Sequence, residues 1–184
     1  MMGQTINLEA AVASFYQPLY RFAYSLTRNE AAALDLTQQT FLILTRHVHQ
    51  IKAQDKLKSW LFTTLRREFL RLVRHQNSHP EVEFQPGQHD VPSTANAEVT
   101  AVDAHTILEA LDQVDETYRI TLKLFYLGEL SYREIADTLG IPVGTVMSRL
   151  SRGKDQLRAR LGELRTRADP KIIPLDERKR RNHG

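Results

Sequence analysis

The sequence predicts an all-α protein made of two small helical domains joined by a flexible acidic linker. Apolar residues recur at three- and four-residue spacing in both halves of the chain, as in amphipathic helices. Alternating strand patterns are absent, and a segment rich in proline and carboxylates separates the two halves. At 184 residues with 41% hydrophobic composition, the chain is long enough for two such compact units.

The first domain is expected over residues 8–76, because neither Gly nor Pro interrupts the helical spacing there after Pro18. Residues 77–104 contain no Lys or Arg and have a composition that cannot bury a core, so they are expected to form the linker. Helical spacing resumes over residues 105–164, the expected second domain. Residues 165–184 are expected to be a mobile, basic tail.

Charge is distributed in blocks along the chain. The net charge of +3 divides into about +5 for residues 1–76, −5 for 77–104, −1 for 105–164 and +4 for the remainder. The absence of cysteine excludes disulfides and thiolate metal sites. Neither a leader pattern nor an apolar run of about 20 residues is present, so we expect a cytoplasmic protein without membrane insertion.

The second domain contains the pattern of a helix-turn-helix. Ser131 and Glu134 form a capping box, so a helix is expected to begin at Ser131. Gly140 is expected to end that helix in the left-handed conformation, and Pro142 to start the next one.

The second helix of this motif has two different faces. Val146, Leu150, Gly153 and Leu157 are expected to pack inward. Arginines flank a free side of shorter side chains, as a recognition helix in a DNA major groove requires. The free side carries Met147, Ser148, Ser151 and Lys154, and the flanking residues are Arg149, Arg152 and Arg158.

The first domain carries a basic helix from Trp60 to Arg74. Its apolar stripe is Phe62, Leu65, Phe69 and Leu72. Its basic face is Arg67, Arg71 and Arg74, with Arg66 and Lys58 nearby. This face could hold a sugar-phosphate backbone while aromatic residues stack on unpaired bases, although core packing is the favoured role of Trp60.

On the preceding helix, Asp35, Gln38 and Gln39 share one face, where a partner helix could dock.

Two stretches resemble extracytoplasmic-function (ECF, group IV) sigma factors of the sigma-70 family. The run SYREIADTLGIPVGTVMSRLSRGKDQLRARL is similar to the family's promoter-binding region 4, and YRFAYSLTRNEAAALDLTQQTFLIL with KSWLFTTLRRE is similar to region 2. The resemblance implies a sigma factor that binds core RNA polymerase through the clamp helices and the flap, reads the −35 element and melts the −10 element. It implies no catalysis, no cofactor and no metal, and an anti-sigma protein as a further partner.

The helix faces described above, read together with the resemblance, predict three groups of functional residues. The clamp-contact residues are Asp35, Gln38 and Gln39. The −10 residues are Lys58, Trp60, Arg66, Arg67, Arg71 and Arg74. The −35 residues are Thr145, Met147, Ser148, Arg149, Ser151 and Arg152. Three of these depart from the family pattern: Gln39 replaces glutamate, Arg67 stands where asparagine is frequent, and Met147 stands where lysine or arginine is usual. Gln39 is expected to weaken binding to the clamp, Arg67 to alter the preferred −10 sequence, and Met147 to alter the preferred −35 sequence.

Two alternatives from other classes are open at this point. A stand-alone helix-turn-helix regulator would bind duplex operator DNA, commonly as a dimer, and would not need the first domain. A metal-dependent enzyme could use His47 with His49, or His75 with His79, but no third ligand accompanies either pair convincingly.

Overall fold

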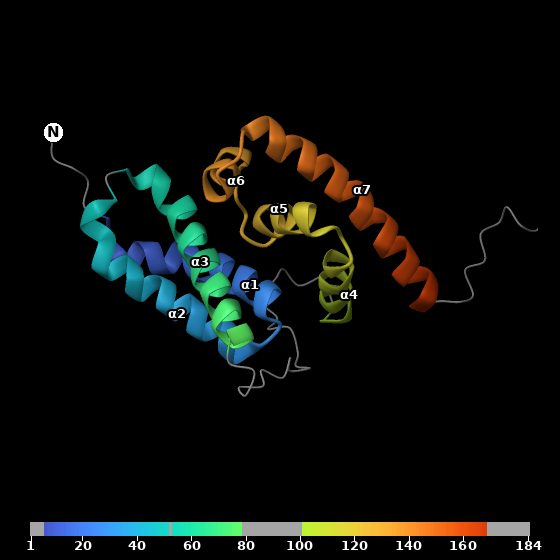
Figure 1. The fold of residues 1–184 in the computed structure, drawn as a ribbon, viewed down its shortest axis with the longest axis horizontal. Helices are drawn as coiled ribbons and strands as arrows, with labels where there is room; N and C mark the ends of the chain where they lie inside the picture. The colour runs from blue at the N-terminus through green and yellow to red at the C-terminus, as the bar shows by residue number, and fades with distance from the viewer. Residues whose placement is uncertain (1–5, 52, 79–100, 169–184) are drawn as a thin grey trace, which may run out of the picture.

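The computed structural model describes residues 6–51, 53–78 and 101–168, and all regular structure in these ranges is helical. An N-terminal unit contains α1 to α3, and a C-terminal unit contains α4 to α7 (Figure 1). The N-terminal helices are Leu8–Thr27 (α1), Glu30–His47 (α2) and Leu57–Ser78 (α3), with 3-10 turns at Val48–Gln50 and Gln54–Lys56. The C-terminal helices are Ala101–Asp112 (α4), Glu116–Tyr126 (α5), Tyr132–Leu139 (α6) and Val143–Ala168 (α7). The all-α prediction is confirmed.

Asparagine residues cap the N-termini of α1 and α2, and Arg28 and Asn29 form the corner between the two helices. Asn7 accepts a hydrogen bond from the Ala10 backbone N at 3.0 Å, and Asn29 accepts one from the Ala32 backbone N at 2.9 Å. Arg28 ends α1 in the left-handed conformation, with φ of 53°. The chain therefore turns within two residues, and α2 packs back along α1.

The N-terminal unit is held together by a fully buried apolar core. The Phe22 ring of α1 and the Phe62 ring of α3 lie 5.4 Å apart, a distance at which aromatic pairs attract beyond their burial. Leu19, Leu44 and Leu65 are fully buried beside them.

In the C-terminal unit, α7 lies close to α5. A Cβ atom on Gly153 would come within 3.1 Å of Leu122 Cδ1 and Tyr118 Cβ, so glycine permits the close approach of the two helices. Val146 and Leu150 are buried on the same face of α7, and Ile135 of α6 is buried as well.

The two units pack directly on each other. Helix α6 lies against α3 and α5 lies against α1, and the buried apolar residues of both units form one continuous cluster. Phe62 of α3 approaches Gly128, in the turn between α5 and α6.

The predicted linker and tail lie largely outside the described residues. Helix α3 continues to Ser78, α4 begins at Ala101 and α7 continues to Ala168, so the helices include the ends of the predicted linker and the first four residues of the predicted tail. This part of the tail contains Arg and Ala, which are strong helix formers. No described helix is both long enough and apolar enough to cross a membrane.

Candidate nucleic-acid interface

The helix-turn-helix forms as its local sequence predicts. Ser131 Oγ accepts a hydrogen bond from the Glu134 backbone N at 3.3 Å, and Glu134 Oε2 accepts one from the Ser131 backbone N at 2.7 Å. This reciprocal pair satisfies two free N–H groups at the start of α6. Gly140 has φ of 66° and ends α6, and α7 begins directly after Pro142.

The outer face of α7 carries the six residues predicted to read the −35 element. Met147 is 54% exposed, and Ser148, Ser151 and Arg152 are exposed as well. Thr145 and Arg149 are half-buried at the border with the buried stripe. Ser148 Oγ donates to the Thr145 carbonyl at 3.0 Å, so its oxygen can still accept a hydrogen bond. The helix thus presents one apolar, three hydroxyl and two guanidinium side chains.

Lys154, which the sequence predicts on this free side, is half-buried, as Thr145 and Arg149 are. Its Nζ lies 4.9 Å from the centre of the Phe125 ring and 6.0 Å from that of Tyr126, a cation–π geometry. Helix α5 therefore holds the lysine against its aromatic residues.

The predicted basic face of α3 is exposed over its C-terminal half. Arg67, Arg71 and Arg74 are all exposed, and Arg66 is half-buried. Arg71 forms an ion pair with Glu68 at 2.7 Å, a surface pair that is weak enough to exchange for a phosphate contact.

On the opposite side of α3, the predicted apolar stripe is buried at its start, at Phe62 and Leu65. It becomes exposed at its end, where Leu72 is 36% exposed.

Trp60 and Lys58 lie at the N-terminal end of α3 and are both half-buried. The Trp60 ring packs against the core and lies 6.4 Å from the His47 ring, as expected for a residue whose favoured role is packing. Lys58 faces the C-terminal unit: its Nζ donates to the Glu129 carbonyl and lies 3.8 Å from Glu134 Oε2.

The three predicted clamp-contact residues share one face of α2. Asp35 and Gln38 are exposed and Gln39 is half-buried, while Leu44 on the same helix is fully buried. The structure thus leaves the carboxylate and one amide open to a partner.

Sequence patterns did not predict a polar cluster at the junction of the units. Lys123 of α5 is buried, with only 4% of the residue exposed. Its ammonium donates hydrogen bonds to the Ser25 carbonyl at 2.6 Å and to Asp112 Oδ1 at 2.9 Å. Arg28 Nε donates to Asp112 Oδ2 at 2.9 Å. Burial raises the pKa of the Asp112 carboxyl, but Lys123 and Arg28 outweigh this effect and hold that pKa below its ordinary value.

Metal binding was the alternative suggested by paired histidines. His47 Nδ1 lies 2.9 Å from the Ile43 carbonyl, and His79 is outside the described residues. Within 6–51, 53–78 and 101–168, no three His, Cys, Asp or Glu side chains gather closely enough to hold a metal ion.

Comparison with known proteins matches both units separately. Residues 11–79 match the model for Sigma-70 region 2, and residues 104–157 match the model for Sigma-70, region 4. The ECF RNA polymerase sigma factor SigE of Mycolicibacterium smegmatis is 36% identical over 145 residues, which cover 76% of this chain and 56% of SigE. The ECF RNA polymerase sigma factor SigL of Mycobacterium tuberculosis is 34% identical over 177 residues, which cover 89% of this chain and 98% of SigL.

Among solved structures, the sigma factor RpoE of Bartonella quintana, crystallised with the anti-sigma factor NepR, has the same fold. Its TM-score is 0.69 at 25% identity, over 84% of this chain and 96% of RpoE. The match to region 2 disfavours a stand-alone helix-turn-helix regulator, which would not need that unit. Two family regions in the expected order, with a relative matched along nearly its whole length, show that the chain belongs to the ECF sigma factors of the sigma-70 family.

Proposed function

We propose that this protein acts as a group IV sigma factor, which binds core RNA polymerase, directs it to promoters and helps to open the DNA for transcription initiation. The observation that carries the proposal is the presence of two separate polar, cation-bearing surfaces, on α3 of the region 2 unit and on α7 of the region 4 unit. We expect the chain itself to catalyse no reaction and to act in the cytoplasm, where polymerase and promoter meet.

Polymerase docking is assigned to Asp35, Gln38 and Gln39 on α2. Two of these side chains are exposed, and they can meet the clamp helices without rearrangement of the buried core. Gln39 carries no charge, unlike the glutamate of the family pattern. Charge-assisted hydrogen bonds are about twice as strong as neutral ones, so this contact is expected to be weaker than in relatives with glutamate. The flap is the proposed polymerase contact of the region 4 unit.

Recognition of the −35 element is assigned to the outer face of α7. Arg149 and Arg152 can donate to phosphates or to guanine edges, and Ser148 and Ser151 can reach bases at short range. Met147 places an apolar side chain where a thymine methyl could lie, since apolar contacts with that methyl carry sequence information. A −35 sequence with thymine opposite Met147 is therefore the expected preference.

Contact with the opened −10 region is assigned to the exposed cations of α3. Arg67, Arg71 and Arg74 form a track that can follow a single-stranded backbone, and Arg66 lies beside it. Lys58 and Trp60 are the remaining proposed −10 residues, and both lie at the N-terminal end of α3. There Lys58 contacts Glu129 and Glu134 of the C-terminal unit, and Trp60 packs against the apolar core.

We further propose an anti-sigma protein as the inhibitory partner. The structural relative RpoE, which shares the fold over 84% of this chain, was crystallised with an anti-sigma factor. The two-unit architecture offers such a partner surfaces on both units at once.

The proposal is tested by transcription with purified core polymerase on a library of randomised promoters. The expected result is stable association with core polymerase and transcripts from promoters that share two spaced elements. Arg149→Ala should weaken selection at the upstream element, and Arg71→Ala selection or opening at the downstream one. Tight binding to duplex sites without polymerase association or initiation would instead identify a stand-alone regulator.

A further inference from the structure

Three residues hold α7 against α5 just beyond the residues of α7 that are proposed to read DNA. Gly153 permits the close approach of the two helices. Lys154 lies over the Phe125 ring, near the C-terminal end of α5. Gln156 is hydrogen-bonded to Asp115, at the opposite end of α5. Helix α7 is therefore attached to both ends of α5 within four of its own residues.

The contact between Gln156 and Asp115 is reciprocal. The Asp115 backbone N donates to Gln156 Oε1 at 3.0 Å, and Gln156 Nε2 donates to Asp115 Oδ2 at 2.6 Å. The two bonds fix both the position and the orientation of the Gln156 amide, because its oxygen and its nitrogen must each face a particular atom. We call this pair the α5–α7 clasp.

The Asp115 carboxylate is used in an unusual way for its position. Asp115 directly precedes the first residue of α5, where an aspartate side chain commonly accepts a hydrogen bond from an N–H group of its own helix. Among the described residues, its side chain makes no such bond and binds Gln156 of α7 instead. The carboxylate therefore serves to hold α7 rather than to stabilise the start of α5.

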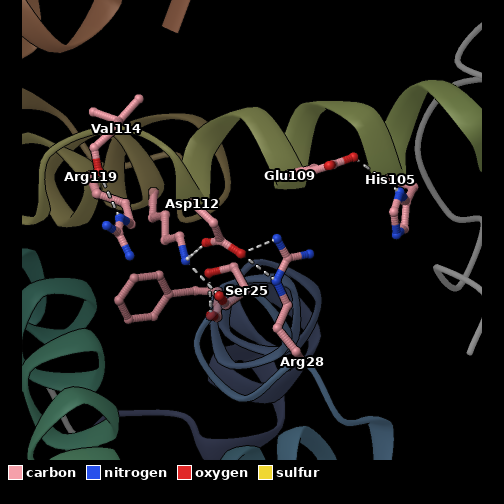
Figure 2. Close-up of polar contacts among 9 residues, drawn as sticks. Ser25, Arg28, His105, Glu109, Asp112, Val114 and Arg119 are labelled. Atoms are coloured by element: carbon pink, nitrogen blue, oxygen red, sulfur yellow. Dashed lines mark hydrogen bonds and ion pairs between the residues drawn. The ribbon is translucent and has the colours of Figure 1, made fainter. Parts of the chain in front are cut away.

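The start of α5 is a firm support for the clasp. Arg119 Nε donates to the Val114 carbonyl at 2.9 Å (Figure 2). The Asp115 carbonyl accepts from the backbone N–H groups of Tyr118 and Arg119 at 2.9 and 2.8 Å. Val114 itself is buried. Because the backbone on both sides of the clasp is bonded in this way, Asp115 has little freedom to move, and its position is passed on to α7.

The orientation of a recognition helix must be set closely. The side chains of a helix extend about 5–6 Å from its axis, so a rotation of roughly 10° displaces their ends by about 1 Å. Hydrogen bonds to base edges need donor–acceptor distances of about 2.7–3.2 Å, and a displacement of this size breaks them. Contacts with phosphates carry no sequence information, so rotation costs specificity before it costs general DNA binding.

We propose that the α5–α7 clasp determines specificity at a distance: Gln156 and Asp115 are positioning residues that orient the reading face of α7 on the −35 element without touching DNA. The inference rests on the proposed function, since it requires that α7 reads the −35 element. Loss of the clasp lowers the discrimination between correct and incorrect −35 sequences and leaves non-specific binding in place.

The test compares four variants of the full chain. Gln156→Leu removes both hydrogen bonds of the clasp, and Gln113→Leu is the matched control, because it makes the same exchange at an exposed glutamine before α5. Asp115→Asn keeps an oxygen at the same distance from the backbone, so it should preserve the clasp. Asp115→Ser has a side chain too short to reach Gln156 but suited to cap α5.

The first readout is amide hydrogen exchange at position 115, where the backbone N–H donates to Gln156. A single hydrogen bond contributes about 0.5–1.5 kcal/mol, so we expect about threefold to tenfold faster exchange in Gln156→Leu. The rate should be unchanged in Gln113→Leu. This measurement needs neither polymerase nor DNA.

The second readout is discrimination at the −35 element. It is the ratio of the affinities of polymerase holoenzyme for a duplex with the selected −35 sequence and for the same duplex with one base pair changed. We expect Gln156→Leu to lower this ratio about fivefold or more, the worth of a misplaced base contact. Affinity for a duplex without the element, and its salt dependence, should not change. Asp115→Asn and Gln113→Leu should keep the native ratio.

Asp115→Ser separates positioning from stability. Urea unfolding should show it to be as stable as the native protein or more so, because α5 regains a cap, while its discrimination falls. Discrimination that only follows stability from variant to variant would overturn the proposal, as would a native ratio in Gln156→Leu. Failure of the native protein to select any −35 sequence would instead refute the proposed function and the inference with it, while faster exchange in Gln156→Leu would still demonstrate the clasp.

Discussion

Gly128→Ala gives a sharp test of the contact between the two units. A Cβ atom at this position would lie 2.7 Å from Phe62 Cε1, 2.8 Å from the Leu124 carbonyl oxygen and 2.9 Å from Leu130 Cδ1. Carbon atoms in contact prefer about 3.5–4.0 Å, so the methyl group cannot enter without movement of its neighbours. Phe62 is fully buried, so its ring cannot move aside into solvent.

The expected cost follows from this crowding. Insertion of a methyl group into a packed core costs about 1–3 kcal/mol. Replacement of glycine by alanine recovers roughly 0.4–1 kcal/mol by restricting the unfolded chain. The methyl group would touch three neighbouring atoms, and one of them is a backbone oxygen. We therefore expect Gly128→Ala to lower the free energy of unfolding by about 1–2 kcal/mol. Urea unfolding followed by circular dichroism measures it.

Gly162→Ala is the matched control, since a Cβ atom there meets no other atom within 4 Å. That variant should gain about 0.5–1 kcal/mol, as expected for alanine in a helix interior. Adding Phe62→Leu to Gly128→Ala should relieve part of the crowding, with a favourable coupling above about 0.5 kcal/mol. Equal stability of the two alanine variants would refute the packing of Gly128, and the absence of coupling would refute the role of Phe62.

Three further predictions concern individual side chains. Ser131→Ala should lower the free energy of unfolding by about 0.5–2 kcal/mol in urea titrations, with Ser131→Thr as the control, because it removes the cap of α6; no loss would contradict the capping role. The pKa of Asp112 is lowered, so its stabilisation is present above the unfolded-state pKa of about 3.9 and is lost as pH falls through the lower folded-state value. The stability gap between the native protein and Asp112→Asn, followed by urea unfolding, should therefore shrink below about pH 4, and a gap that persists in acid would count against the ion pairs. Arg149→Ala should weaken binding of polymerase holoenzyme to a −35 duplex by roughly 1–3 kcal/mol if Arg149 contacts a base, or reduce the salt dependence if it contacts phosphate. Unchanged values of both would remove Arg149 from the site.

The sequence predicted the helix-turn-helix well because its signals are local. Ser131, Glu134 and Gly140 act within one or two helical turns, and their hydrogen bonds and backbone angles follow from residue type. The spacing of Val146 and Leu150 likewise predicted the buried side of α7. The opposite side was predicted less well: Lys154 has the spacing of an exposed residue, but the aromatic residues of α5 reach it.

The junction between the units could not be predicted in the same way. Lys123 stands between two leucines of an amphipathic helix, and helical spacing alone does not show whether such a lysine is buried. Its partner carbonyl belongs to Ser25, 98 residues earlier, and the contact exists because α5 packs on the end of α1. No sequence pattern marks Arg28 as a partner of Asp112 either. Its left-handed φ of 53° turns the chain at the end of α1, where its guanidinium meets the Asp112 carboxylate.

The arrangement of the polar cluster around Asp112 bears on how readily the units can separate. In this cluster only Lys123 is fully buried, and the side chains of Asp112 and Arg28 are 37% and 27% exposed. A buried ion pair is strongly destabilised when one partner leaves, because the other charge then remains desolvated. Here Lys123 and Asp112 belong to the same unit and lie 2.9 Å apart, so they would stay paired and regain water together when the units part. The groups left behind are Arg28, which would become solvated at the end of α1, and the Ser25 carbonyl. Separation therefore strands no charge in an apolar core, and the main loss is the apolar contact around Phe62 and Gly128. An interface built in this way can align the two units closely and still open at moderate cost.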